Sequence, residues 1–182
     1  SSKVIKINKS NLNKNLEADG MITSMNNIVL GVLTADCAPI FIYDDKNKFV
    51  CGLHSGWKGS LNNISNKAVK LFEKYNIKRE KLIAIIGPCL GVKNYEVDNE
   101  FKRKFINKNI RYSKFFRNKN NVKSLFNLRG LINYQLRELG LKKIYNINRD
   151  TYLNKNLFFS HRRSTHEAKK TTGRLINLIS LT

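Results

Sequence analysis

The chain has 182 residues, which is enough for about one domain with a substantial buried core. Hydrophobic residues make up 41% and aromatic residues 10%, which excludes a disordered tail, and no apolar run approaches the roughly 18 residues of a membrane-spanning helix. The formal net charge is +21, from 34 Lys and Arg against 13 Asp and Glu, and this suggests nucleic acid, membrane surfaces or phosphate-bearing substrates as partners.

Short apolar runs predict strands along most of the chain. Their ranges are 4–7, 21–23, 28–33, 39–43, 49–54, 82–86, 143–147, 157–160 and 175–181. Several of these runs lack strict alternation, which is typical of strands covered on both faces.

Helices are fewer than strands. Apolar residues at steps of three and four predict one helix over 60–75, and acidic residues in a first turn predict another over 98–106. Asn127 is suited to cap a third helix that stops at Gly140. Because strands outnumber helices and do not alternate regularly with them, the pattern favours an α+β or mixed-sheet fold over a doubly wound parallel one.

The most basic stretch, 102–123, has nine Lys or Arg and no acid, with Phe105, Tyr112, Phe115 and Phe116 interleaved. Such a segment could clamp single-stranded nucleic acid by stacking. No RNA-binding signature accompanies it, and Lys and Asn are abundant from end to end. We therefore expect the aromatic rings to pack inward and do not expect specific nucleic-acid binding despite the net charge of +21.

The three cysteines are Cys37, Cys51 and Cys89. With no secretory signal pattern beside them, they predict reduced thiols and a cytoplasmic protein. Cys51 falls in the middle of a predicted strand, so we expect it in the core.

Two segments, 33–39 and 53–59, place reactive side chains where predicted strands end. The first carries Asp36 and Cys37, and the second carries His54 and Trp57 between glycines. A Cys and a His that meet can form a nucleophilic dyad or bind zinc or copper. The alternative is a buried cysteine beside a core histidine.

Seven motifs occur in an order that resembles the YfiH-like laccase-domain family, also called multicopper polyphenol oxidoreductases and peptidoglycan-editing factors. They are EADG (17–20), TADCAP (34–39), HSGWKG (54–59), IGPC (86–89), YEV (95–97), FFSHRR (158–163) and TGR (172–174). The resemblance covers nearly the whole chain and implies one domain, 1–182. It implies an α+β fold, a layered sandwich of mixed β-sheets with helices packed on the outside.

The resemblance implies a purine nucleoside phosphorylase that acts on inosine, adenosine or methylthioadenosine with phosphate, and that also deaminates adenosine. It implies zinc, with copper as the alternative, held by two His and one Cys. Cys37 and His54 match two of these ligands. The third His would fall just before Ser1, so we expect an N-terminally truncated chain, with His161 and His166 as fallback ligands.

Expected catalytic residues are Cys37, His54 and Asp36. Asp36 could orient a ligand or move a proton. We expect Arg162, Arg163 and Arg174 to bind phosphate. Trp57 is expected either to stack on the purine or to anchor the core instead. The chain departs from the family pattern in lacking a second Cys after 86–89 and in carrying Asp150-Thr151 in place of Cys-Thr and His161 in place of Tyr.

Because these two cysteines are missing, the chain has fewer thiol ligands, and this disfavours a site for several copper ions. Rival functions are a copper-dependent polyphenol oxidase, a Cys–His hydrolase acting in peptidoglycan editing, and a nucleic-acid-binding protein. We expect no membrane association, and a monomer.

Overall fold

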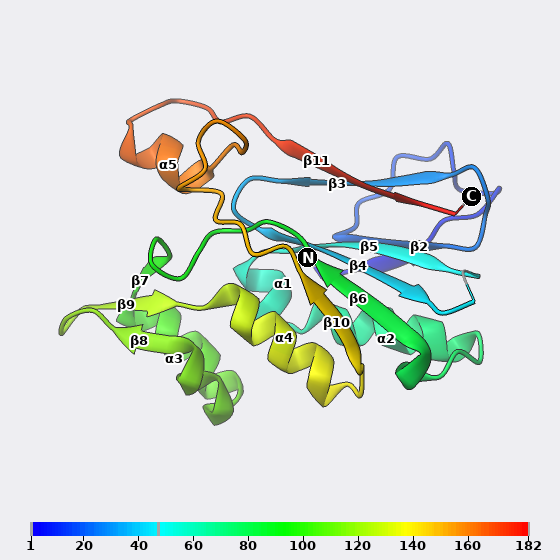
Figure 1. Cartoon of the computed structure of the whole chain (residues 1–182), viewed down its shortest axis with the longest axis horizontal. Helices are drawn as coiled ribbons and strands as arrows, with labels where there is room; N and C mark the ends of the chain where they lie inside the picture. The colour runs from blue at the N-terminus through cyan, green and yellow to red at the C-terminus, as the bar shows by residue number, and fades with distance from the viewer. Residues whose placement is uncertain (1, 47, 182) are drawn as a thin grey trace.

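The computed structural model describes residues 2–46 and 48–181. Its centre is a six-stranded sheet with the order β1-β2-β5-β4-β6-β10 (Figure 1). The strands, in that order, are Val4–Lys6, Gly20–Thr23, Val50–Ser55, Ala38–Asp44, Leu82–Ile86 and Lys143–Asn146. The two outer pairs, β1–β2 and β6–β10, are parallel and the inner pairs are antiparallel, so the sheet is mixed.

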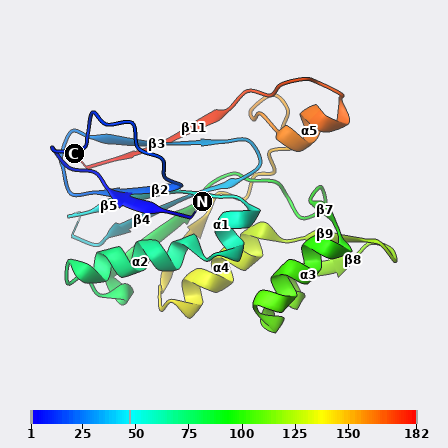
Figure 2. The same ribbon diagram turned by 180° about the vertical axis from the view of Figure 1, so that it is seen from behind.

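Two further layers cover this sheet. Helices α1 (Trp57–Leu61), α2 (Ile64–Lys74) and α4 (Leu128–Glu138) lie on one face, and an antiparallel ribbon of β3 (Val29–Thr34) and β11 (Leu175–Ser180) lies on the other (Figures 1 and 2). The predicted α+β fold of layered mixed sheets with outer helices is thus confirmed. The ribbon's outward side chains, among them Leu33 and Ile176, are exposed.

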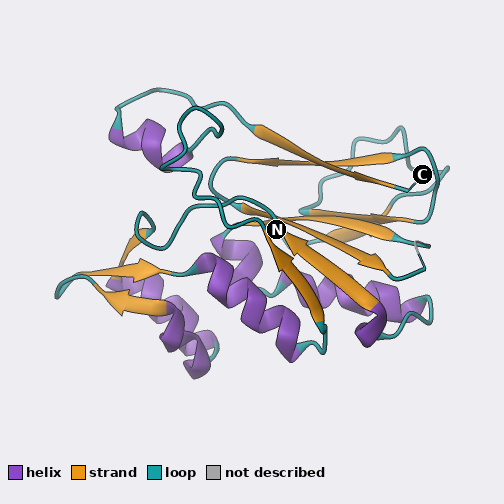
Figure 3. Cartoon of the chain, viewed as in Figure 1, coloured by secondary structure: helices purple, strands orange, loops and turns teal. Residues whose placement is uncertain are grey.

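A smaller unit stands beside these layers. Strands β7 (Glu96–Asp98), β9 (Lys123–Phe126) and β8 (Phe116–Asn118) form a three-stranded antiparallel sheet next to α3 (Asn99–Lys108) (Figure 3). The last helix, α5 (His161–His166), lies near one end of the β3–β11 ribbon. Short 3₁₀ helices occupy Arg79–Lys81 and Ile110–Phe115.

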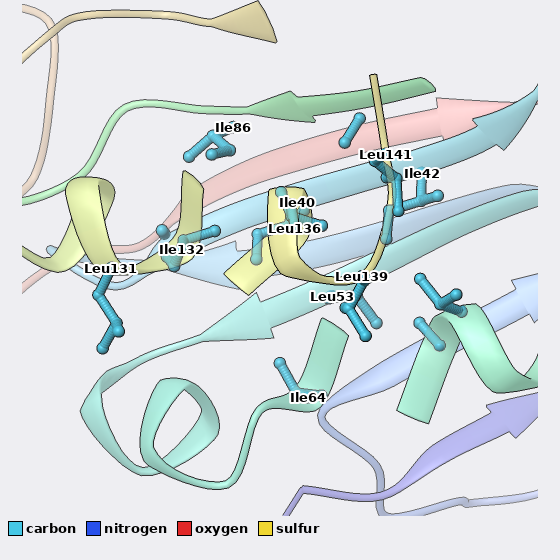
Figure 4. Packing of buried hydrophobic residues seen from close by; sticks show 14 of the residues in the cluster. Ile40, Ile42, Leu53, Ile64, Ile86, Leu131, Ile132, Leu136, Leu139 and Leu141 are labelled. Atoms are coloured by element: carbon cyan, nitrogen blue, oxygen red, sulfur yellow. The ribbon is translucent and has the colours of Figure 1, made fainter. Parts of the chain in front are cut away.

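The core lies between the sheet and its helices (Figure 4). Ile40 and Leu53 from the sheet and Leu131 and Leu136 from α4 are fully buried. Strand β4 is buried at nearly every position, because the ribbon covers the face that the helices leave open. This double coverage confirms the interpretation of the apolar runs without alternation.

The prediction of one continuous helix over 60–75 is wrong. Asn62 and Asn63 interrupt it, and Asn63 takes a left-handed backbone conformation with φ 49°. Its side chain accepts a hydrogen bond from the backbone N–H of Asn66, so it starts a second helix. The predicted cap at Asn127 is confirmed, since its side chain accepts from the backbone N–H of Gly130 at 2.8 Å.

The strand predicted over 157–160 is wrong, because residues 154–158 form hydrogen-bonded turns. Strands β7, β8 and β9 and helix α5 were not expected from the sequence pattern. In the basic stretch 102–123, Phe105 and Tyr112 are buried, and Phe115 and Phe116 pack against the same core. The prediction that these rings turn inward is confirmed, as is the core position of Cys51.

Candidate active site

Cys37 and His54 lie at the same end of two neighbouring strands. Cys37 closes the tight turn between β3 and β4, and His54 is the penultimate residue of β5. Strands β4 and β5 run antiparallel with Pro39 opposite His54, so the turn that carries Cys37 lies beside the end of β5. The sheet register therefore brings the two side chains together.

Gly56 marks the space that the two side chains share. A Cβ at this residue would lie 2.7 Å from the Cys37 sulfur and 4.0 Å from His54 Nε2. Any side chain at position 56 would collide with the thiol, so glycine keeps the space between thiol and imidazole open. The thiol and Nε2 thus lie close to one small region, and their joint binding of a cation stays a prediction.

A carboxylate approaches His54 from the other side of its ring. Asp19 Oδ1 lies 3.9 Å from His54 Nδ1, and the backbone N–H of His54 donates to the Asp19 carbonyl at 2.7 Å. Asp19 belongs to the EADG motif, but sequence reasoning gave it no role. The two ring nitrogens therefore face different groups, Asp19 and the region of Cys37.

Asp36 is buried, and both of its carboxylate oxygens are engaged. Oδ1 accepts from the Thr151 hydroxyl at 2.6 Å, and Oδ2 accepts from the backbone N–H of Arg162 at 2.6 Å. Its backbone has φ 81°, a left-handed conformation that Asp tolerates better than most residues. This geometry supports a positioning role for Asp36, while the predicted proton transfer stays a prediction.

A cavity of about 490 Å³ opens beside Cys37. Side chains lining it come from the β3–β4 turn, α1, the small sheet and α5. The lining includes Asp36, Cys37, Trp57, Tyr95, Phe101, Lys123, His161 and Arg162. The cavity thus joins the candidate thiol to aromatic surfaces and to charged groups of both signs, since Glu96 and Asp98 also line it. Apolar surface with a few polar groups is usual for small-molecule sites.

The three predicted arginines have different environments. Arg162 lines the cavity and donates to the carbonyls of Asn94 and Glu96. Arg174 precedes β11, and its positive charge acts on both Cys37 and His54. Arg163 lies in a separate cavity of about 360 Å³ and donates to the carbonyls of Thr151, Tyr152 and Phe158. The structure thus gives Arg163 a structural task where the sequence predicts a phosphate contact.

The electrostatic setting decides the resting charges of the pair. Burial, and then the charge of Asp36, raise the pKa of the Cys37 thiol to about 11, with Arg174 acting in the opposite direction. Burial lowers the pKa of the His54 imidazole, while Asp19 opposes this shift. At neutral pH both groups are therefore uncharged, and the thiolate needs a further cation beside it to form.

The Cys37 sulfur and His54 Nε2 are suited to be two of the ligands of a zinc ion. Thiolate and imidazole are the donors that zinc prefers, and catalytic zinc sites use three protein ligands plus an open position. Within residues 2–46 and 48–181, no group of three His, Cys, Asp or Glu side chains is placed to hold an ion. His161 lines the cavity without completing such a group, and His166 Nδ1 instead lies 2.9 Å from the Tyr152 hydroxyl.

Sequence reasoning missed several residues around the site. Asp19 lies in the EADG motif and Tyr95 in the YEV motif, and membership in these motifs is the sequence signal that could have found them. Lys123 ends the basic stretch 102–123, and Thr151 belongs to the Asp150-Thr151 departure from the family pattern, but neither residue has a predicted role. Only the fold brings them to the cavity or to Asp36.

A family model described as multi-copper polyphenol oxidoreductase laccase matches residues 1–182. This chain belongs to that family. The resemblance inferred from the seven motifs is thereby confirmed.

The chain is similar to a purine nucleoside phosphorylase of Rickettsia prowazekii, with 42% identity over 154 residues, covering 82% of this chain and 62% of that protein. It is also similar to a purine nucleoside phosphorylase of Haemophilus influenzae, with 33% identity, covering 91% of this chain and 66% of the relative. The chain thus spans about 62% of the length of the first of these relatives.

Solved structures share the fold. The protein YfiH of Bacillus licheniformis matches with a TM-score of 0.90 and 27% identity, covering 100% of this chain and 71% of that one. YlmD of Geobacillus stearothermophilus matches with a TM-score of 0.87 and 25% identity, covering 99% and 70%. Within the described part of this chain, no helix is both long and apolar enough to span a bilayer.

Proposed function

We propose that this protein is a zinc-dependent purine nucleoside phosphorylase that also deaminates adenosine. The observation that carries the proposal is the convergence of the Cys37 thiol and His54 Nε2 on Gly56, beside a cavity of about 490 Å³. A cavity of this size is in the usual range for small-molecule sites. Similarity to relatives named purine nucleoside phosphorylase supports the choice of substrate.

Phosphorolysis needs an anion site next to the ribose. Phosphate would attack C1′, the C1′–N9 bond would break, and the purine would leave with the electron pair and take up a proton. Arg162 and Arg174 can hold the phosphate, since a guanidinium has five N–H donors and only part of them bind backbone carbonyls here. Lys123 adds positive charge at the wall of the cavity.

The purine needs a flat apolar surface. Trp57 lines the cavity at the start of α1, and its ring lies 5.4 Å from the ring of Phe101. A purine that stacks on the Trp57 ring would lie in the cavity that Cys37 and Arg162 also line. Trp57 packs against the core, and contact with the purine would be its second task.

Cys37 and His54 would hold the zinc ion, together with a third ligand that the described side chains do not supply. When bound, zinc supplies Lewis acidity and an acidified water for the removal of ammonia from adenosine. Asp36 keeps the Cys37 turn in place through Thr151 and Arg162.

An assay with defined omissions tests the proposal. The protein supplied with zinc should convert inosine and phosphate into hypoxanthine and ribose 1-phosphate, and should release no base when phosphate is left out. Adenosine should yield inosine and ammonia. Cys37→Ala should abolish both reactions, whereas Cys51→Ala, which removes a thiol from the core of the same sheet, should keep them.

Other outcomes distinguish the rivals. Oxygen consumption with phenols and bound copper would indicate the polyphenol oxidase. Metal-independent hydrolysis of peptidoglycan fragments, blocked by thiol alkylation, would indicate the Cys–His hydrolase, although a thiol with its pKa raised to about 11 is a poor unassisted nucleophile. A zinc-loaded protein that turns over neither nucleoside would refute the proposed function.

A further inference from the structure

The EADG motif contains a carboxylate whose backbone is fixed from two sides. The N–H of Asp19 donates to the Lys3 carbonyl at 3.0 Å, and its own carbonyl accepts from the N–H of His54 at 2.7 Å. Gly20 permits this close fit, because a Cβ there would lie 2.4 Å from Leu53 Cδ2. Asp19 is therefore held between β1 and β5, directly beside His54.

The two nitrogens of the His54 ring have separate neighbours. Nδ1 lies 3.9 Å from Asp19 Oδ1, while Nε2 lies 4.0 Å from the Cβ position of Gly56, which is 2.7 Å from the Cys37 sulfur. A distance of 3.9 Å exceeds a direct hydrogen bond, and a small side-chain rotation or one bridging water closes it. Catalytic contacts are often this long before a ligand binds.

We propose that Asp19 is a positioning residue that holds His54 in the tautomer with the proton on Nδ1. A neutral imidazole carries one N–H and one lone pair, and a carboxylate next to Nδ1 can only accept. The proton is thus drawn to Nδ1, and the lone pair is left on Nε2, toward Cys37. This inference deepens the proposed function and rests on its assignment of His54 as a metal ligand, because a ligand nitrogen must present its lone pair.

Nuclear magnetic resonance of the metal-free protein tests the tautomer without any activity measurement. The chain has three histidines, so long-range ¹H–¹⁵N correlations can be assigned by the single variants His161→Ala and His166→Ala. At a pH where the rings are neutral, His54 in the wild type should show a protonated Nδ1 and an unprotonated Nε2. Asp19→Ala should move the proton to Nε2, while Asp19→Asn, whose amide oxygen can still accept, should restore part of the original ratio.

Zinc titration provides a second readout. Asp19→Ala should weaken zinc binding by about 10- to 100-fold relative to the wild type, the usual effect of losing such a partner. Asp45→Asn, at the far end of β4, should change neither the tautomer nor the zinc affinity. Unchanged His161 and His166 signals would show that the variant is folded.

The outcomes separate the two proposals. A wild-type His54 with its proton on Nε2, or an Asp19→Ala variant with an unchanged tautomer, would overturn the role of Asp19 whatever the activity of the protein. A tautomer that depends on Asp19 in a protein without phosphorylase activity would support that role and refute the proposed function alone.

Discussion

At the scale of single residues, Asp36 joins three parts of the chain that are distant in sequence. Its carboxylate links the β3–β4 turn to the Thr151 hydroxyl and to the first turn of α5. A buried donor that loses its acceptor costs more free energy than the bond contributes when formed, because that donor stays without water. The carboxylate is therefore expected to matter for stability as well as for the shape of the cavity.

Asp36→Asn tests this expectation, because Asn tolerates the left-handed backbone and changes only the acceptor chemistry. One donor, the N–H of Arg162 or the hydroxyl of Thr151, would face an amide NH₂ group. We expect a loss of about 1–3 kcal/mol in the free energy of unfolding, measured by urea denaturation. The matched variant Asp45→Asn removes an exposed ion pair with Lys81 and should cost less than about 1 kcal/mol. Equal urea midpoints for the two variants would contradict the role of Asp36.

Cys37 is the thiol whose reactivity reports its charge state. Because burial and Asp36 raise its pKa to about 11, the metal-free thiol is protonated at neutral pH. Below the pKa the thiolate fraction grows with pH, so alkylation by iodoacetamide should speed up by about 100-fold between pH 7 and pH 9. Mass spectrometry of the labelled peptides measures the rate, and the buried Cys51 and Cys89 serve as internal controls. Rapid labelling at pH 7, without dependence on pH, would contradict this prediction.

At the scale of elements, the break between α1 and α2 depends on Asn63. This residue has φ 49° and also caps α2 through its side chain. Asn63→Ala should lose the cap and add the cost of a left-handed alanine, about 2 kcal/mol in total by urea denaturation. Asn127→Ala, a cap of α4 without positive φ, should lose about 1 kcal/mol. If Asn127→Ala were the more destabilising change, the backbone conformation at Asn63 would not carry the cost that we assign to it.

Most of the central strands could be predicted from the sequence, because each is an apolar run that two layers cover. The exceptions have physical reasons. Strands β7, β8 and β9 are too short to show a repeating sequence pattern. Aromatic packing around Phe126 stabilises the small sheet. The apolar segment 157–160 instead supplies the Phe158 carbonyl to Arg163, and Ser160 caps α5. A short apolar run does not by itself distinguish a strand from a turn that precedes a capped helix.

At the scale of the whole molecule, the net charge of +21 does not by itself indicate a nucleic-acid partner. The aromatic rings of the basic stretch pack into the core, which removes the stacking surface that single-stranded nucleic acid would need. The Cys37–His54 pair could be anticipated because the TADC and HSGW motifs flank strand ends. The positions of Asp19 and Thr151 could not be anticipated. They depend on which segments lie side by side, namely strands β1, β2 and β5 for Asp19 and residues 148–160 for Thr151.

The site is assembled from two kinds of scaffold. The thiol and the imidazole stand on adjacent hydrogen-bonded strands, whereas Arg162 and Arg174 arrive on the segment 148–174, which is mostly turns and one short helix. Sequence variation in that segment can therefore change which ligand is accepted while the donor atoms keep their spacing. Libraries for altered specificity would best be confined to 148–174, with Thr151 and Arg163 retained, and would leave 34–57 untouched.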